Sequence, residues 1–197
     1  MKITKITLLL TLSFLLLACG RSKEAQFYLL NPLPPQKQNG QPYRYLQIGI
    51  DEINIPPYTE KPQLMIHCTP HRLELEEYHQ WAEALDKNIT RVVETNLSNL
   101  LPGAIVESSP WNSRFKPGYH LQIDISQLDI DVHGYSSLAA EYLIYHEDEL
   151  VKKGTVYYHT KVPVVNIESL VISVNTNLSC LTQEIARVFA RMSIKDK

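Results

Sequence analysis

The sequence lacks the short motifs that would define most enzymes and nucleic-acid-binding proteins. It contains no glycine-rich phosphate loop, no G-x-S-x-G nucleophile motif and no internal repeat. Its net charge is −2, without a cluster of lysine and arginine, which argues against nucleic acid as a partner. Its 44% hydrophobic and 20% charged residues are typical of a folded chain, and 197 residues suffice for one ordinary domain.

The sequence also lacks an apolar run long enough to cross a membrane. The longest run, residues 6–18, follows Lys2 and Lys5. At 1.5 Å per residue it reaches only about 20 Å, whereas the hydrocarbon core is ~30 Å thick. A short positive region followed by such a run is typical of a bacterial export signal, so we interpret residues 1–18 as a signal peptide.

The end of this signal, Leu16-Leu17-Ala18-Cys19-Gly20, resembles the lipobox of bacterial lipoproteins. In a lipobox the signal is cut before the cysteine, here between Ala18 and Cys19, and the sulfur receives diacylglycerol. We expect diacylglycerol and an N-acyl chain on Cys19 as lipid attachment, with no other cofactor. Two or more acyl chains make a stable anchor. The alternative is an ordinary signal peptide followed by a coincidental cysteine.

The residue after the lipid cysteine is Gly20 and not aspartate. In Gram-negative bacteria this choice is generally associated with delivery to the outer membrane. We therefore expect the chain to be anchored in the inner leaflet of the outer membrane and to face the periplasm. Residues 19–25 would form a polar tether, and residues 26–197 the folded domain.

With Cys19 used by the lipid, only Cys68 and Cys180 remain, in an oxidising compartment that allows a disulfide. The patterns argue against a Cys68–Cys180 bridge. Cys68 falls in phase with the inward residues Leu64 and Ile66 of a strand, whereas Cys180 falls off the apolar stripe of its helix.

Hydrophobic patterns predict the order β-β-β-α-β-β-β-α, a single α+β domain in which a mostly antiparallel or mixed β-sheet packs against two long α-helices. A parity change predicts a β-bulge at Ser126-Gln127, and a turn is expected around Lys153-Gly154. The expected strands cover residues 26–31, 43–55, 63–69, 119–132, 137–146 and 155–165.

Apolar residues three and four apart predict the two helices. The first covers residues 75–100 and ends before Pro102-Gly103, with Leu75, Tyr78 and Trp81 on its core face. The second covers residues 167–192, with Asn166 as its N-cap.

Residues 67–89 hold three histidines and five acidic residues, which suggests a metal or acid/base site. Pro70 prevents His67 and His71 from sharing a helical face, and in an extended chain their rings would be about 13 Å apart. The predicted helix places His79 on a solvated face among glutamates. We therefore expect no metal site, no catalytic residue and no enzyme activity. An exported hydrolase remains as a third hypothesis, after the two that are given below.

Residues 72–103, RLELEEYHQWAEALDKNITRVVETNLSNLLPG, resemble the signature block of the ABC-type transport auxiliary lipoproteins. The sequence YLLNP after the lipid cysteine and Pro110-Trp111 fit in order, so the resemblance covers nearly the whole chain after the signal. The positions taken as family signature or core are Arg72, Leu73, Trp81, Leu85, Leu97 and Trp111.

The resemblance implies a non-enzymatic subunit of an intermembrane transport system. Such lipoproteins accompany MCE-domain transport proteins, which carry lipids or other hydrophobic molecules across the periplasm. The chain would dock the distal end of that MCE conduit at the outer membrane. Homo-oligomerisation would suit a ring-shaped partner. The alternative is that the domain itself binds and carries a lipid in an apolar groove between sheet and helices.

Replacing Cys19 with alanine should release the protein from membranes, because the acyl chains are then absent. Fractionation of the cell envelope measures this release. Continued sedimentation of the Cys19→Ala protein with the outer membrane would contradict the lipid anchor.

Overall fold

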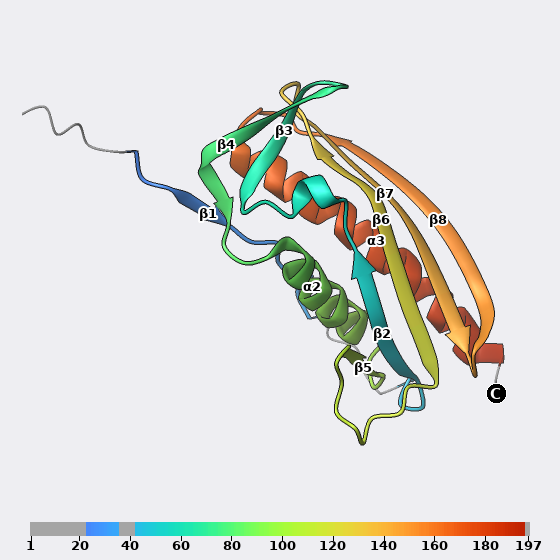
Figure 1. Ribbon diagram of the computed structural model, residues 1–197. Helices are drawn as coiled ribbons and strands as arrows, with labels where there is room; N and C mark the ends of the chain where they lie inside the picture. The colour runs from blue at the N-terminus through green and yellow to red at the C-terminus, as the bar shows by residue number, and fades with distance from the viewer. Residues whose placement is uncertain (1–22, 36–41, 196–197) are drawn as a thin grey trace, which may run out of the picture.

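Two β-sheets share one pair of long helices in the computed structural model, which describes residues 23–35 and 42–195 (Figure 1). The predicted α+β class is therefore confirmed. The strands are β1 (Gln26–Tyr28), β2 (Gln47–Asn54), β3 (Gln63–Thr69), β4 (Arg72–Trp81), β5 (Ile105–Ser108), β6 (Tyr119–Ile130), β7 (Tyr135–His146) and β8 (Glu149–Lys161). The helices are α2 (Leu85–Leu100), α3 (Ile167–Lys195) and the short 3-10 helix η1 (Pro57–Thr59).

The larger sheet has the strand order β5-β2-β6-β7-β8, and the smaller has the order β1-β4-β3. Strand β2 is parallel to β5 and β6, whereas β6, β7 and β8 form antiparallel hairpins. The pairing of β6 with β7 shifts register between Ile125 and Gln127, which confirms the predicted bulge. One bridge, between His67 and Asp131, joins the two sheets.

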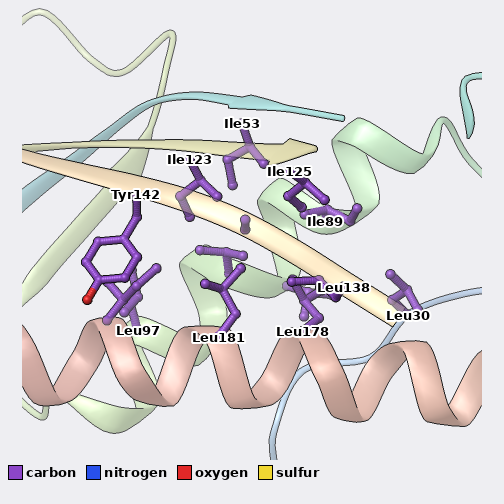
Figure 2. Packing of buried hydrophobic residues seen from close by; sticks show 14 of the residues in the cluster. Leu30, Ile53, Ile89, Leu97, Ile123, Ile125, Leu138, Tyr142, Leu178 and Leu181 are labelled. Atoms are coloured by element: carbon purple, nitrogen blue, oxygen red, sulfur yellow. The ribbon is translucent and has the colours of Figure 1, made fainter. Parts of the chain in front are cut away.

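The core lies between the larger sheet and the two helices, which run side by side from the end of the molecule that carries β1 (Figure 1). Alternate residues of β6, among them Ile123 and Ile125, point toward α3, as do residues of β7 such as Leu138 (Figure 2). They meet Leu178 and Leu181 of α3. Burial of each such side chain contributes roughly 1.5–3 kcal/mol, so this layer supplies much of the stability.

Helix α2 begins at Leu85 and not at Leu75, so the predicted start of the first helix is wrong. Residues 72–81 instead form β4, which leaves Leu75 and Tyr78 exposed. The cause is an irregularity in the pairing, because Gln63 and Met65 of β3 face Gln80 and Leu75 of β4. An advance of two residues along β3 thus corresponds to five residues along β4. The bulge removes the period of two from β4, so its apolar residues mimic helical spacing.

The turn expected at Lys153-Gly154 is also misplaced, since β7 and β8 connect through Glu147 and Asp148. Both turn residues have positive φ, 48° and 66°, as a tight two-residue hairpin requires. Gly154 lies within β8, opposite Tyr142, whose ring occupies the space where a side chain would stand. This glycine therefore marks a close packing contact and not a turn.

Three further findings concern the predicted elements. The sequence analysis missed the short parallel strand β5 and the division into two sheets. The predicted N-cap is confirmed, because Asn166 Oδ1 accepts a hydrogen bond from the amide of Ser169 at 2.8 Å. Cys68 and Cys180, the two cysteines within the described residues, are both free thiols, so the disulfide that the compartment allowed is absent.

The structure places the N-terminal segment and the C-terminal end of α3 at opposite ends of the molecule (Figure 1). Within residues 23–35 and 42–195, no helix has the length and apolarity needed to cross a bilayer. Signal residues 1–18, including Ala18, and the lipid-attachment residue Cys19 lie outside the described residues.

Replacing Gly154 with alanine should lower the free energy of unfolding by about 1–3 kcal/mol, because the new methyl group would overlap the buried ring of Tyr142. Gly118→Ala is the matched control, since its methyl group would have its nearest neighbour, the carbonyl oxygen of Gln47, at 3.9 Å. Denaturant unfolding of both variants measures the difference. Equal stabilities would show that Gly154 carries no packing constraint.

Candidate functional site

The extended segment at residues 30–33, which we call the N-terminal strap, lies across both helices. It follows β1, and its first residue, Leu30, is fully buried in the core beside Leu138 and Leu178 (Figure 2). An extended chain packed on helices has no neighbouring strand to bond its backbone. Buried backbone groups without partners cost about 1–3 kcal/mol each, so side chains must supply the bonds here.

Asn88 of α2 bonds both backbone groups of Leu30. Its Oδ1 accepts a hydrogen bond from the Leu30 amide at 2.7 Å, and its Nδ2 donates to the Leu30 carbonyl at 3.0 Å. The side chain of Asn88 is fully buried, so water cannot compete for these bonds. The amide group of Asn88 therefore takes the place of a paired strand.

Three more asparagines hold the rest of the N-terminal strap. Asn175 of α3 accepts a hydrogen bond from the Asn31 amide at 2.8 Å, and Asn96 of α2 accepts one from the Leu33 amide at 2.6 Å. Asn99 donates to the Leu33 carbonyl at 3.0 Å. Because residue 32 is a proline without an N–H group, every backbone amide of the strap is bonded to a side chain.

Asn96 also joins the two helices, and Asn177 joins α3 to the larger sheet. Asn96 Nδ2 donates to Thr182 Oγ1 of α3 at 3.1 Å, in a contact that is fully buried. Asn177 of α3 bonds Ser136 of β7 and accepts a hydrogen bond from Thr160 of β8. The hydrogen bonds of these buried asparagines thus hold the N-terminal strap, the helix pair and the larger sheet in one arrangement.

Asn88, Asn96 and Asn177 each begin an N-x-S/T triplet, the sequence pattern of a glycosylation acceptor. The structure shows that these residues have structural roles. The sequence indicates these roles only through position in the helical repeat. Asn88 and Asn96 are eight residues apart, and Asn96 falls on the apolar stripe of its helix. An asparagine on an apolar stripe predicts a buried backbone partner, but the sequence does not show which backbone.

An open cleft of about 1100 Å³ lies between β2, the first turns of α2 and the residues after β5. Five carboxylates and two cations line it, a formal charge of −3: Asp51, Glu52, Glu60, Asp86 and Glu94, with Lys87 and Arg91. We call it the acidic cleft. Its lining comes from segments far apart in the sequence, which explains why sequence reasoning missed it.

Two walls of the acidic cleft are held in place by hydrogen bonds. Asp51 Oδ1 lies 2.8 Å from Nδ1 of His120 on β6. Glu94 Oε2 accepts a hydrogen bond from Ser108 of β5 at 2.6 Å, which links α2 to the sheet edge. Glu52 is exposed at the cleft wall. The arrangement suits a positively charged segment of a partner and is too polar for an acyl chain.

A second polar cluster joins the two sheets at Asp129. Its Oδ1 accepts a hydrogen bond from the Tyr58 hydroxyl at 2.7 Å and lies 3.0 Å from Nε2 of His67, and its Oδ2 accepts one from Gln127 at 2.6 Å. The pKa of Tyr58 is raised to about 12, chiefly by burial; the bond from the Leu128 amide lowers it, whereas the bond to Asp129 and the charge of that carboxylate raise it. Asp129 is occupied by these donors, so the cluster is a structural junction.

The histidines of residues 67–89 therefore do not form one site. His67 belongs to the Asp129 junction, and His79 lies on β4 with its Nδ1 2.8 Å from the hydroxyl of Tyr28. The prediction that His79 lies on the solvated face of a helix is wrong, because residues 72–81 form the strand β4. Across the part of the chain that the structure describes, no three His, Cys, Asp or Glu side chains come together as metal ligands.

The predicted signature residues lie in three places and do not form one site. Trp81 at the end of β4 and Leu85 at the start of α2 line a small apolar cavity, and Leu97 is buried in the core. Trp111 packs over Gly49 of β2 on the outer side of the larger sheet. Arg72 and Leu73 begin β4, where Arg72 pairs with Glu74 at the surface.

The space between sheet and helices is filled. The apolar cavity beside Trp81 and Leu85 has a volume of only about 20 Å³. That is room for about one water molecule. The described part of the chain therefore offers no interior groove of acyl-chain size at this position, although such a groove was the structural basis of the lipid-carrier alternative.

Two solved structures share this arrangement of two sheets and two helices, which defines the fold class of the chain. One is the crystal structure of an uncharacterized protein, 18% identical, with a TM-score of 0.72 over 85% of this chain and 99% of that chain. The other is protein XCC0632 from Xanthomonas campestris, 15% identical, with a TM-score of 0.68 over 87% and 98% of the two chains. At these identities the likeness shows the fold alone.

The chain belongs to the ABC-type transport auxiliary lipoprotein component family, whose sequence profile matches residues 28–186. Intermembrane transport lipoprotein PqiC of Escherichia coli (strain K12) and PqiC of Shigella flexneri are each 22% identical to it over 106 residues. That match covers 54% of this chain and 55% of each relative, so the chain spans about half the length of the curated relatives it matches. The resemblance inferred from residues 72–103 is thus confirmed, and the chain is a transport auxiliary lipoprotein.

Replacing Asn88 with leucine keeps the branched shape and the number of heavy atoms of the side chain but leaves the buried N–H and C=O groups of Leu30 without partners. We expect the free energy of unfolding to fall by about 2–4 kcal/mol. Asn112→Ala is the control, because Asn112 caps only the amide of Arg114 in an exposed loop and its loss should change stability by at most about 0.5 kcal/mol. Equal unfolding midpoints for the two variants would show that the N-terminal strap is not coupled to the core.

Proposed function

We propose that this chain is the lipid-anchored periplasmic subunit of an MCE-type intermembrane transport system and docks the MCE-domain protein at the outer membrane of a Gram-negative bacterium. The observation that carries the proposal is family membership over residues 28–186, together with relatives named intermembrane transport lipoproteins. In this role the protein is not an enzyme. It fixes position through its anchor and receives its partner through a folded surface.

The filled interior favours docking over carrying. A carrier needs an apolar cavity that accepts an acyl chain, and pockets for small ligands are commonly about 300–1,000 Å³. The apolar cavity between sheet and helices is about 20 Å³, and the large cleft is lined by charged residues. Lipid carried by the system would therefore travel in the MCE conduit, and this chain would hold the end of that conduit in place.

The acidic cleft is the surface we assign to the partner. Its formal charge of −3 fits a positively charged segment of the MCE-domain protein. Complementary charge of this kind steers encounter and fixes the register of an interface more than it adds affinity. A homo-oligomer of this chain would present several such clefts, which suits a ring-shaped partner.

The anchor in this proposal is Cys19, with diacylglycerol and an N-acyl chain. Lys23 follows Cys19 by four residues, and β1 begins at Gln26. Four residues reach at most about 14 Å. The folded domain would therefore stay close to the inner leaflet of the outer membrane, with the end of α3 directed away from the anchored end (Figure 1).

Charge reversal in the acidic cleft tests the docking surface. Glu52→Lys should reduce recovery of the MCE-domain protein about tenfold, the equivalent of ~1.4 kcal/mol, when the lipoprotein is purified from crosslinked cell envelopes. Glu149→Lys is the matched control, since Glu149 is also an exposed carboxylate, beside the β7–β8 turn and outside the cleft. Quantitative mass spectrometry measures the MCE-domain protein in each preparation.

Two results would contradict the proposal at different levels. Equal recovery with both variants would remove the acidic cleft as the docking surface. Absence of any MCE-domain protein from the preparation of the unaltered lipoprotein would remove the docking function itself. Stoichiometric lipid bound to the purified domain, beyond the acyl chains on Cys19, would favour the carrier alternative instead.

A further inference from the structure

The end of the molecule next to the tether exposes apolar side chains. Along β1 and the two residues that follow it, the side chains alternate: Tyr28 and Leu30 pack against the core, whereas Phe27 and Leu29 point outward. Phe27 is 63% exposed and Leu29 42% exposed. On the neighbouring strand β4, Tyr78 is 38% exposed. We call Phe27, Leu29 and Tyr78 the tether-side patch.

The tether-side patch is rigidly placed. β1 pairs in parallel with the end of β4, from Gln26 opposite His79 to Tyr28 opposite Trp81. Directly after the patch, the N-terminal strap is bonded to both helices through Asn88, Asn96 and Asn175. The patch therefore does not swing on a flexible linker, and its orientation is that of the whole domain.

The length of chain between the patch and the anchor limits what can cover it. Lys23 is the first described residue, and its ammonium group lies 5.3 Å from the centre of the Tyr78 ring. From Cys19 to Lys23 the chain reaches at most about 14 Å. The headgroup layer on one side of a bilayer is about 5–8 Å thick. With Cys19 acylated, Lys23 and the ring of Tyr78 must lie at or near the membrane surface.

The chemistry of this end fits a phospholipid surface. Aromatic side chains with one polar end favour the boundary between headgroups and acyl chains, and lysine keeps its charge in water while its stem covers apolar surface. Two cationic residues, Arg21 and Lys23, and one carboxylate, Glu24, lie between Cys19 and β1 in the sequence. Glu74 and Glu77 of β4 lie beyond the part of β4 that pairs with β1, toward the β3–β4 turn.

We propose that Phe27, Leu29 and Tyr78 form a membrane-contact surface that rests in the headgroup layer of the bilayer holding the acyl anchor. The proposal rests on the lipid anchor of the proposed function and deepens it. The acyl chains hold the protein at the membrane, and the tether-side patch sets its orientation. Because both helices start at this end, the β7–β8 turn and the end of α3 face away from the membrane (Figure 1).

Tryptophan reporters in the acylated protein test the contact. Phe27→Trp places an indole in the patch, and Tyr157→Trp places one on β8 at a site of matching exposure, 61% against 63%. Each variant is reconstituted in phosphatidylethanolamine and phosphatidylglycerol vesicles whose acyl chains are either plain or brominated. Trp81 and Trp111 give the same background in both variants.

We expect the Phe27→Trp emission to shift to shorter wavelength in vesicles and to lose intensity with brominated lipid, beyond the loss in the parent protein. The Tyr157→Trp emission should lose no more intensity with brominated lipid than the parent emission does, and it should not shift to shorter wavelength in vesicles. Leu29→Trp provides a second reporter in the patch and should behave as Phe27→Trp does.

Flotation with the vesicles and incorporation of a fatty-acid probe at Cys19 are measured on the same samples. Normal flotation without extra quenching at Phe27 and Leu29 would overturn the membrane contact while leaving the anchor intact. The Phe27→Trp emission could instead shift to shorter wavelength without being quenched by brominated lipid, while the mass of the protein exceeds that of one chain. This result would overturn the membrane contact and show that a second copy of the chain covers the patch. Loss of acylation and flotation would overturn the anchor itself.

Discussion

The hydrogen bonds between buried asparagine side chains and the backbone of residues 30–33 are the constraint on which the rest of the structure depends. This stretch runs extended over two helices and belongs to neither sheet, and its first residue, Leu30, is buried from water. Asn88 alone satisfies both backbone groups of Leu30, and Asn96 connects Leu33 to Thr182 of the other helix. Without these amides, buried N–H and C=O groups would oppose the burial of Leu30.

This constraint connects the tether to the core and gives the molecule two distinct ends. At one end, β1, β4 and the start of both helices surround the point where the chain emerges. At the other lie the β7–β8 turn and the end of α3 (Figure 1). Between them, α2 and β2 form the walls of the acidic cleft. The division suits the proposed function, in which an anchor at one end and a partner at the cleft act on one rigid body.

The sequence predicts elements well where the pattern is regular and fails where the pairing is not. The strand at residues 63–69, the bulge at Ser126-Gln127 and the Asn166 cap were all predicted, since each depends on local periodicity or local bonding. Strand β4 was read as helix because its bulge against β3 removes the period of two. Gly154 was read as a turn because the ring of Tyr142 above it belongs to another strand.

The candidate sites could be predicted less well than the fold, and the reason is distance along the chain. Asn88 lies 58 residues from Leu30, its partner, and the lining of the acidic cleft comes from β2, α2 and the end of β5. Helical phase marks Asn96 as facing inward, but only the folded chain shows that it bonds the N-terminal strap. The lipobox and the family resemblance are local patterns, so they carried the functional inference that the sequence allowed.

Amide hydrogen exchange at Leu30 and Leu33 tests the central claim most directly, because those two N–H groups bond to Asn88 and Asn96. If the N-terminal strap is part of the core, both amides should exchange only through global unfolding, as slowly as the amide of Val92 within α2. Exchange at the rate of an exposed loop amide without a hydrogen bond would show that the strap opens independently. The domain would then not be held in a fixed orientation relative to its tether.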